Sequence, residues 1–592
     1  MVDAEHRVAA FTFSQPSRFN RLFQLLTQFL LWLDRSPAHF WSFVAIASLL
    51  LLASALAAFF HPASARRWNH PLVFVALLFV TIFAFRWPLI FDNRELNNPD
   101  ESQMLAGAIA LQHDPVFWRS VDGNTTGPLD QWPLAMLGAL GVRLDYTNAR
   151  LLALALAAST LAFTWLALRV RFDDGLARVL TLPPAALQIV TPFWDFVQYS
   201  SEHVPVTLLA AATWLILAEL YPKIRHDRPW RWLLAGVLLG AVPFAKLQGA
   251  PAGLWLAVAL VFLLFDLPRP LRTRLRSAGF LVAGALVVPV AIFLLVLWHG
   301  LWSEFWSAYI VNNYAYGQRF AGGWSDYTRG FLALVRNATG FELYFFPMLG
   351  ALLVALPWRV HRWSHAESRV NLISLGLLAI AAWSVAAPGR TYTHYLQFIT
   401  APLALATGAL VGAIPQIFRA HSHPALRHAA APALLLLFLG VTLWPQSKFC
   451  TYMEYPPIGH YTQTHGRLLR SPEATLLATF SRPEEPIAAW GWTPRFFVEA
   501  QRRHAPREAH SALQLFEAPV RDFYRERYLA DFQRTQPPWF LDTTGPGGFA
   551  FDDRSKHGHE TFPELAALIA RDYRLVAESG SARLYGRATA TP

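Results

Sequence analysis

Long apolar runs constrain this chain more than any other feature of its 592 residues. A helix needs about 20 mostly apolar residues to cross the hydrocarbon core of a bilayer. Runs of that length, or close to it, lie at 40–60, 71–91, 148–169, 178–194, 203–221, 232–246, 249–265, 278–298, 341–357, 370–387, 393–414 and 429–446. We therefore expect a mainly α-helical, polytopic membrane protein with about twelve transmembrane helices.

Basic residues predict which side of the membrane each connection faces. Cytoplasmic connections carry an excess of Lys and Arg. Here the basic residues fall in alternate connections: Arg66 and Arg67; Arg169, Arg171 and Arg178; Lys223, Arg225, Arg228 and Arg231; Arg269, Arg272, Arg274 and Arg276; Arg359, Arg362 and Arg369; Arg419 and Arg427. These connections are expected in the cytoplasm. The same distribution attributes the net charge of +11 to topology and argues against nucleic acid as a partner.

The two ends of the chain differ from its middle. Segment 1–38 contains an amphipathic stretch at 19–33, expected as an interfacial helix or as half of a helical hairpin that would make a thirteenth span. No cleavable secretory signal is expected, because the first eighteen residues lack an apolar core. The transmembrane domain is predicted at 39–446, with outer loops at 92–147 and 299–340.

Residues 447–592 are predicted to form a soluble α/β domain on the outer side. Charged residues become frequent there, and 487–492, 538–544 and 573–587 have strand-like patterns, separated by helical patterns at 518–532 and 562–572. The aromatics of 491–496 and those around Trp539 are suited to stacking on sugar rings, but the simpler expectation places them in the core of this domain. The single cysteine, Cys450, excludes a CxxC metal or redox site.

The first outer loop concentrates carboxylates next to the membrane, where they are costly unless they serve a function. They are Asp100, Glu101, Asp114, Asp122 and Asp130. Asp100 follows Pro99 and opens a helical pattern, so the simplest interpretation is a helix N-cap. Further along, the loop has a turn at 127–129, and Arg150 lies at the start of the next apolar run.

This order of features resembles the first outer loop of the multi-spanning GT-C glycosyltransferases that use polyprenyl-phosphate donors. The family includes the protein O-mannosyltransferases (family 39) and the lipid A aminoarabinose transferases. Its Asp-Glu pair matches Asp100-Glu101, and its helix-opening arginine matches Arg150. Its PPL element is altered here to Gly127-Pro128-Leu129 or Trp132-Pro133-Leu134. That departure leaves the type of acceptor more open than the type of reaction.

Other stretches fit the same resemblance. Lys246 lies in a Lys-x-x-Gly turn between two spans, where a lysine is commonly only an anchor at the membrane surface. Arg319 precedes Phe320 in the second outer loop. The 390–395 segment supplies Arg390, His394 and Tyr395. The resemblance implies that these residues and Arg150 bind the donor phosphate, since guanidinium and ammonium groups hold phosphate well.

The chemistry that the resemblance implies is glycosyl transfer with inversion. Asp100 acts as the general base or orients the acceptor, and Glu101 shares that role. Glu202 and His203 lie at the outer end of a span as supporting residues; two residues are too few for a metal site, so a divalent cation (Mg or Mn) stays an open cofactor. The partners implied are a polyprenyl-phosphate-linked sugar, membrane lipids and a lipid, glycan or protein acceptor, at the bacterial inner membrane.

Two other functions are compatible with the span count. A polysaccharide ligase or polymerase also uses lipid-linked donors, but we expect its Arg and His residues in a long late loop. A secondary transporter is expected to contain internal repeats and polar or glycine-broken spans near mid-membrane. The acidic residues of this chain gather instead in one outer loop, which favours the glycosyltransferase.

Overall fold

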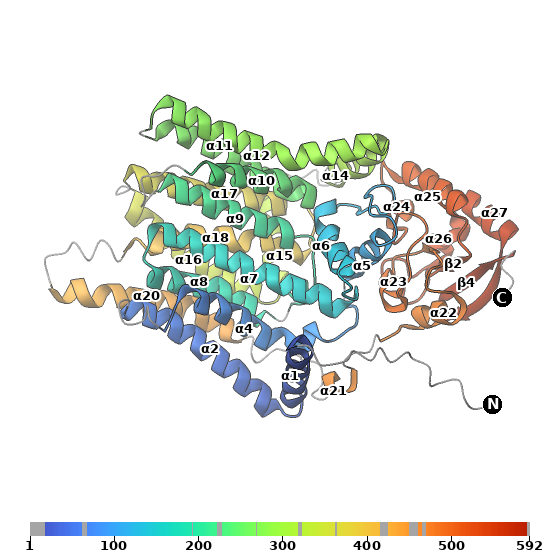
Figure 1. The fold of residues 1–592 in the computed structure, drawn as a ribbon, viewed down its shortest axis with the longest axis horizontal. Helices are drawn as coiled ribbons and strands as arrows, with labels where there is room; N and C mark the ends of the chain where they lie inside the picture. The colour runs from blue at the N-terminus through green and yellow to red at the C-terminus, as the bar shows by residue number, and fades with distance from the viewer. Residues whose placement is uncertain are drawn as a thin grey trace.

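The computed structural model describes residues 18–61, 68–96, 98–191, 193–221, 228–267, 269–317, 323–360, 364–414, 424–448, 460–464 and 469–588. Long helices run side by side through most of its length, and a smaller mixed domain lies at one end of them (Figure 1). Arg66, Arg67, Lys223, Arg225, Arg319, Arg362, Arg419 and Cys450, which entered the sequence-based predictions, lie outside the described residues.

Each predicted apolar run overlaps one long helix of the bundle. These helices are α2 (Pro37–Phe60), α4 (Pro71–Ile90), α7 (Tyr146–Arg171), α8 (Asp174–Val190), α9 (His203–Leu220), α10 (Pro229–Ala245), α11 (Ala250–Asp266), α12 (Leu271–Trp298), α16 (Phe341–Val360), α17 (His365–Ala386), α18 (Gln397–Val411) and α20 (Pro424–Ser447). Within the described chain, 8 segments are long and apolar enough to cross a membrane, and several of the others are shorter apolar helices. The expected polytopic helical fold is confirmed.

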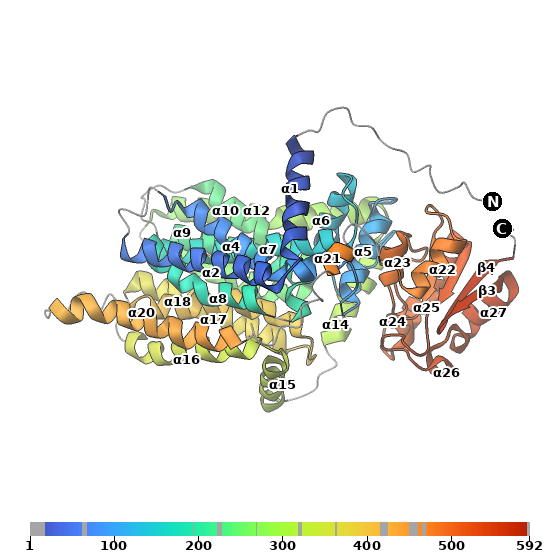
Figure 2. The same ribbon diagram turned by 90° about the horizontal axis from the view of Figure 1, so that it is seen from below.

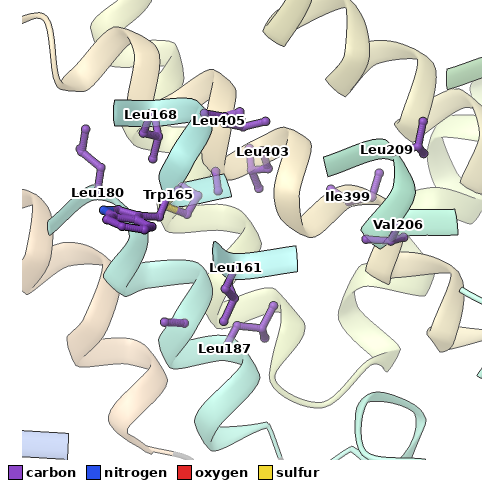
Figure 3. Packing of buried hydrophobic residues seen from close by; sticks show 14 of the residues in the cluster. Leu161, Trp165, Leu168, Leu180, Leu187, Val206, Leu209, Ile399, Leu403 and Leu405 are labelled. Carbon is purple, nitrogen blue, oxygen red and sulfur yellow. The ribbon is translucent and has the colours of Figure 1, made fainter. Parts of the chain in front are cut away.

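The centre of the bundle is a buried apolar core, and much of its surface is also apolar. Helix α18 is wholly buried, and its Leu403 and Leu405 pack near Leu161 and Trp165 of α7 and Leu180 of α8 (Figure 3). Helix α12, by contrast, exposes an apolar row: Val282, Leu286, Val290, Leu294 and Leu297. An apolar face of this length is stable against lipid and not against water, as a multi-pass membrane protein requires.

Two arginines that were counted as loop charges lie inside the bundle. Arg178, in α8, is fully buried and donates to Asn69 Oδ1 at 2.5 Å and to Ser54 Oγ at 3.0 Å. Arg171, at the end of α7, is buried against Glu367 and the carbonyl of Ala409. Both side chains therefore join helices together, because a buried guanidinium needs hydrogen-bond acceptors from the elements packed around it.

Helix α1 (Arg18–Leu33) crosses the bundle helices instead of running alongside them (Figure 2). Its C-terminal end packs on α2, with Phe29 edge-on to Phe43 at 5.1 Å between ring centres. A helical hairpin would place α1 antiparallel to α2. The crosswise position favours the interfacial helix.

The first outer loop packs against the end of the bundle. Its helices α5 (Asp100–Leu111) and α6 (Pro128–Ala139) lie between the bundle and the C-terminal domain (Figure 1). The side chains of α5 from Glu101 to Leu111 are all buried, because α6, α7 and that domain pack around the helix. The same end carries the short elements η1 (Trp194–Phe196), η2 (Leu247–Gly249), α13 (Trp302–Glu304), η3 (Phe305–Val311), α14 (Asn312–Gly317), α15 (Trp324–Asn337) and η4 (Thr393–Leu396).

The C-terminal domain contains a four-stranded sheet in the order β1-β2-β4-β3. Strands β1 (Ile487–Trp490) and β2 (Trp539–Asp542) are parallel, and β2 and β3 (Tyr573–Ser579) both pair antiparallel with β4 (Ala582–Arg587). The single strand predicted at 573–587 is thus a hairpin that turns at Gly580, whose φ of 60° suits glycine. The helices of the domain are α22 (Pro472–Phe480), α23 (Arg495–Ala500), α24 (Ala512–Leu515), α25 (Arg521–Thr535), α26 (Arg554–His557), η6 (His559–Thr561) and α27 (Pro563–Asp572). The short helix α21 (His460–Thr464) packs instead beside α1, where Thr462 bonds to Asp34 (Figure 2).

Candidate functional site

A cavity of about 430 Å³ lies where the bundle, the first outer loop and the C-terminal domain meet. Residues from all three regions line it: Asn98, Asp100, Gln103, Met104, Gly123, Asn124, Thr125, Thr126, Trp194, Asp195, Ser201, Lys246, Tyr316, Thr391, Tyr392, Thr393, His394, Tyr395, Trp492, Phe516, Phe549 and Ala550. A concave site with a few convergent charged groups is the usual form of a ligand or active site.

Asp100 enters this cavity from the first turn of α5. It is not the helix N-cap expected from the sequence: the cap residue is Pro99, which makes no side-chain cap bond, and the Asp100 amide is held by Asn98 Oδ1 at 3.0 Å. Because Asn98 satisfies that amide, the carboxylate of Asp100 is left for the cavity. Its side chain is 40% exposed there, and its nearest charged neighbour is His394 Nε2 at 4.0 Å.

Protein atoms around the cavity change the acidity of Asp100. Burial raises the pKa of its carboxyl above the ordinary value of 3.8, although the charges of His394 and Lys246 partly oppose the rise. A carboxylate with a raised pKa is a better proton acceptor at neutral pH than an ordinary aspartate. This combination of exposure into a cavity and a raised pKa is typical of a general base.

Lys246 lies at the floor of the cavity, at the end of α10. It is buried and forms an ion pair with Glu202, and its Nζ also donates to Ser201 Oγ at 2.7 Å. The ammonium lies 4.8 Å from the ring centre of Tyr395, a cation–π contact. A short backbone bridge to Thr126 fixes its main chain. Lys246 is therefore not an anchor at the membrane surface but a preorganised positive charge.

His394 joins the acidic groups of the cavity to one another. Its Nδ1 is 3.6 Å from Asp195 Oδ2, and its Nε2 is 3.9 Å from Glu202 Oε1. Asp195 also accepts hydrogen bonds from Asn98 at 3.1 Å and from Thr393. Burial alone would raise the pKa of Asp195, but the contacts with His394 and Thr393 hold it below its ordinary value.

Asp195 was not among the residues singled out in the sequence. It follows an apolar run within TPFWDF, and the nearby pair Glu202-His203 drew attention instead. The signal that was available is its place: a carboxylate just after a predicted span, on the same outer side as Asp100. Only the fold brings it next to His394, almost two hundred residues away in sequence.

Glu101 and Arg150 do not reach the cavity, contrary to the prediction. They form a 2.8 Å ion pair with both side chains fully buried, and the guanidinium also donates to the carbonyls of Leu89 at 2.9 Å and Arg94 at 2.6 Å. Glu101 additionally accepts from the amide of Tyr199 at 2.8 Å. Every charged atom here is occupied inside the wall of the site, so the pair holds α5 on α7 instead of binding substrate.

His203 also points away from the cavity. Its ring lies in the bundle and lines a separate small void of about 20 Å³ together with Gln188 and Gln397. Arg390 lies beside the cavity with its guanidinium carbon 4.8 Å above the ring of Tyr316, whose hydroxyl is 2.9 Å from that of Tyr395. Among the described residues Arg390 makes no ion pair, and its Nε has no hydrogen-bond partner. An unpaired guanidinium beside the cavity is suited to an anionic ligand.

Asp130 is a second unusual carboxyl, behind Lys246 on α6. It is fully buried, and neither side-chain oxygen has a hydrogen-bond partner among the described residues. Burial raises its pKa well above the ordinary value. Burial therefore favours the neutral form of Asp130, whereas the carboxylates near it are paired with cationic groups.

No family model matches the sequence, and no curated protein matches it. Among the solved structures that resemble the fold are two forms of one protein. The crystal structure of ArnT from Cupriavidus metallidurans bound to undecaprenyl phosphate aligns with a TM-score of 0.54 at 15% identity, over 89% of this chain and 100% of that one. The apo form of the same protein aligns with a TM-score of 0.50 at 15% identity, over 86% and 97% of the two chains.

This chain has the GT-C fold. The polytopic helical fold expected from the Asp-Glu loop and the apolar runs is thereby confirmed. At 15% identity the likeness establishes architecture alone. The chemistry has to be argued from the cavity of this chain.

The described residues do not offer a divalent cation a good set of ligands. In the cavity, Asp195 accepts from Asn98 and Thr393, and Glu202 accepts from Lys246. Among the described cavity residues this leaves Asp100 as the one carboxylate with unused oxygens, whereas Mg²⁺ and Mn²⁺ prefer several oxygen ligands. A grouping of three potential ligands lies in the C-terminal domain, at Asp542, His559 and Glu560. There Arg554 contacts Asp542 at 3.1 Å and Glu560 at 3.7 Å and already supplies the positive charge.

The third wall of the cavity comes from the C-terminal domain. Trp492, Phe516 and Phe549 line it, although the aromatics of 491–496 were expected in the domain core. Phe496 and Phe497 do lie in that core, fully buried. Trp492 differs because Gly491, with a φ of 110°, turns the chain out of the sheet directly before it.

Proposed function

We propose that this chain is an integral-membrane glycosyltransferase that moves a sugar from a polyprenyl-phosphate donor to an acceptor at the outer face of the membrane. One observation carries the proposal: the unused carboxylate of Asp100 shares a cavity with a fixed lysine, Lys246, beside an unpaired arginine, Arg390. The likeness to a structure bound to undecaprenyl phosphate supports a lipid-linked donor.

The reaction is a displacement at the anomeric carbon. An acceptor hydroxyl attacks that carbon, its proton passes to Asp100, and the bond from the anomeric carbon to the phosphate oxygen breaks. The products are the glycosylated acceptor and a free polyprenyl phosphate. Attack from the face opposite the leaving phosphate inverts the configuration.

Positive charge balances the departing phosphate. Arg390 holds the phosphate, and Lys246 lowers the energy of the charge that develops on the leaving oxygen. Glu202 keeps Lys246 in place, and Asp195 orients His394 toward Asp100. Arg319, implied by the resemblance, is a further candidate for phosphate binding. The scheme needs no metal ion, because the basic side chains supply the charge.

The test is donor turnover by the purified full chain in lipid nanodiscs. Free polyprenyl phosphate is measured after addition of polyprenyl-phosphate sugars, for the wild type and for Asp100→Asn. The matched control is Asp114→Asn: Asp114 is in the same loop but pairs with Arg119 at 2.6 Å outside the cavity. We expect turnover in the wild type and the control and its loss in Asp100→Asn. Undiminished turnover by Asp100→Asn refutes the assignment, and sugar uptake into vesicles without transfer would identify a transporter.

A further inference from the structure

The wall supplied by the C-terminal domain differs chemically from the rest of the cavity. Trp492 is at its centre, with Phe549 edge-on at 5.1 Å and Phe516 edge-on at 5.8 Å between ring centres. Phe549 is 56% exposed and Phe516 36% exposed, so both rings face open space and not a packed core. Large aromatic rings left open in a cavity usually serve a ligand.

The indole N–H of Trp492 is a buried polar group without a hydrogen-bond acceptor among the described residues. Other buried tryptophans of this domain satisfy theirs: Trp490 Nε1 donates to the carbonyl of His557 at 2.8 Å. A buried indole N–H without an acceptor lowers the stability of the fold. A bound ligand removes that cost when one of its oxygens accepts the hydrogen bond.

The aromatic wall is held firmly to the helix that carries Asp100. Trp492 stacks on His510 at 5.2 Å, and His510 Nδ1 accepts from the amide of Ala512 at 3.2 Å. The proton is therefore on Nε2, which donates to Gln103 Oε1 at 3.0 Å. Burial lowers the pKa of His510 to about 3, so this link is neutral and stable across the physiological range. Gln103 is three residues after Asp100, on the same face of α5.

Ion pairs further fix the domain on the first outer loop. Arg527 pairs with Asp122 and also with Glu508. Arg507 donates to the carbonyl of Trp118 at 2.8 Å, and its own carbonyl accepts from the amide of Asp122 at 2.7 Å. These buried bonds cross between the two regions on one side of the cavity. The aromatic wall and the carboxylate of Asp100 are thus parts of one rigid site.

Hydrogen-bonding groups line the same cavity as the aromatic wall and Asp100. Asn124, Thr125 and Thr126 line the cavity there, and Asn124 has a φ of 61°, an unusual backbone conformation for a residue other than glycine. Asn312 holds the side-chain oxygen of Asn124 at 3.1 Å. Amide and hydroxyl groups next to aromatic rings match a sugar, whose rings have apolar C–H faces and polar edges. An acyl chain would offer these groups no hydrogen bond.

We propose that the C-terminal domain holds a saccharide subsite for the acceptor, with a sugar ring stacked on Trp492 and Phe549. The proposal rests on the glycosyltransferase function above and narrows its acceptor to a molecule that carries a glycan. The attacking hydroxyl belongs to that glycan. It reaches Asp100 because Gln103 and His510 fix the distance between the stacking wall and the base.

Binding can be measured without catalysis. Saturation-transfer NMR on the full chain in nanodiscs, with maltotriose, chitotriose and mannotriose as probes, reports contact with sugar ring protons. We expect transfer to at least one trisaccharide from the wild type, its loss in Trp492→Ala and its retention in Phe480→Ala. Phe480 is a matched control, since it is a 40% exposed aromatic of the same domain that does not line the cavity. No transfer to any of the three sugars, or equal transfer from Trp492→Ala, overturns the proposal.

Kinetics separate this subsite from the donor site. With glycan-bearing acceptors, Trp492→Ala is expected to raise the acceptor KM about tenfold, while Trp492→Phe recovers part of the loss by restoring a ring. Phe480→Ala should leave both the acceptor KM and the release of lipid phosphate to water unchanged, and Trp492→Ala should keep a measurable release without acceptor. If Trp492→Ala abolishes that release as well, the wall is structural and the subsite is refuted. If the wild type binds trisaccharides but never releases lipid phosphate, the proposed function fails and the sugar site stands.

Discussion

Two neighbouring carboxylates at the start of α5, Asp100 and Glu101, face different regions of the molecule. Glu101 points into the wall, where Arg150 and the amide of Tyr199 use its oxygens. Asp100 points into the cavity, and its nearest charged atom is 4.0 Å away. Both are charged groups in a protein interior, but only one is fully satisfied. The difference separates a residue that holds the fold together from one that is available for chemistry.

The largest expected effect is on catalysis at Asp100. Asp100→Asn should lower turnover about 10²- to 10⁴-fold, the usual contribution of a general base. Its thermal stability should not fall, because the raised pKa of Asp100 means that the fold disfavours the ionised carboxyl, and asparagine removes that charge. Turnover of lipid phosphate and thermal unfolding in nanodiscs check the two parts. A large loss of stability would mean that Asp100, like Glu101, holds the fold together.

Glu101→Gln should behave in the opposite way. It leaves the guanidinium of Arg150 buried without a counter-charge, which costs about 3–5 kcal/mol of folding free energy. Loss of folded protein, followed by size-exclusion chromatography and thermal unfolding, is the readout. The double variant Glu101→Leu with Arg150→Met removes both charges and should recover much of the stability. A double variant as unstable as the single one would contradict a purely structural pair.

Removing the positive charge of Arg390 should weaken donor binding. Arg390→Ala is expected to raise the donor KM about 10- to 100-fold, since charge-assisted hydrogen bonds to phosphate contribute about 1.5–3 kcal/mol. Arg390→Lys keeps the charge but loses the planar fork, so it should recover part of the loss. Steady-state kinetics with varied donor concentration measure both. An unchanged KM in Arg390→Ala would leave phosphate binding to Lys246 and to other basic residues.

The pH dependence of turnover tests the same carboxylate. The base form of Asp100 is active, so activity is full above its pKa in the folded protein and declines as pH falls through that pKa. Because burial raises this value, the acid limb should lie above pH 3.8, the ordinary value for aspartate. The profile of kcat/KM against pH locates the limb. An acid limb at or below the ordinary pKa of aspartate would mean that water in the cavity solvates the Asp100 carboxylate and cancels the effect of burial.

The smallest effect is expected at Asp130. Burial raises its pKa well above the ordinary value and so favours the neutral carboxyl, which Asp130→Asn replaces with a neutral amide. Turnover should stay within about twofold and stability within about 1 kcal/mol. A strong loss of activity would show that Asp130 ionises during the reaction and belongs with Asp100.

The sequence predicted what depends on local pattern. Apolar runs such as 278–298 predict helices directly, since chain length and hydropathy alone decide whether a segment fits a bilayer. Asp100, Lys246 and His394 were found through the resemblance of short motifs, and the fold brings all three to one cavity. Sequence could not separate Asp100 from Glu101, because which of two adjacent carboxylates is neutralised depends on where Arg150 lies in three dimensions. For the same reason the sequence did not identify Asp195 as a site residue, and Trp492 was expected in the domain core.

The aromatic wall also bears on how the protein is made. The helices of the bundle, with Asp100 and Lys246, leave the ribosome before the segment from Trp492 to Ala550 is synthesised. Until that segment folds onto α5, the emerging chain has a cleft with two walls that is open to water. A chain shortened after the bundle would keep its base and its lysine but would have nothing to hold an acceptor. Such a product would be expected to hydrolyse its donor instead of transferring the sugar. Synthesis of the last domain therefore limits the loss of lipid-linked sugar to hydrolysis.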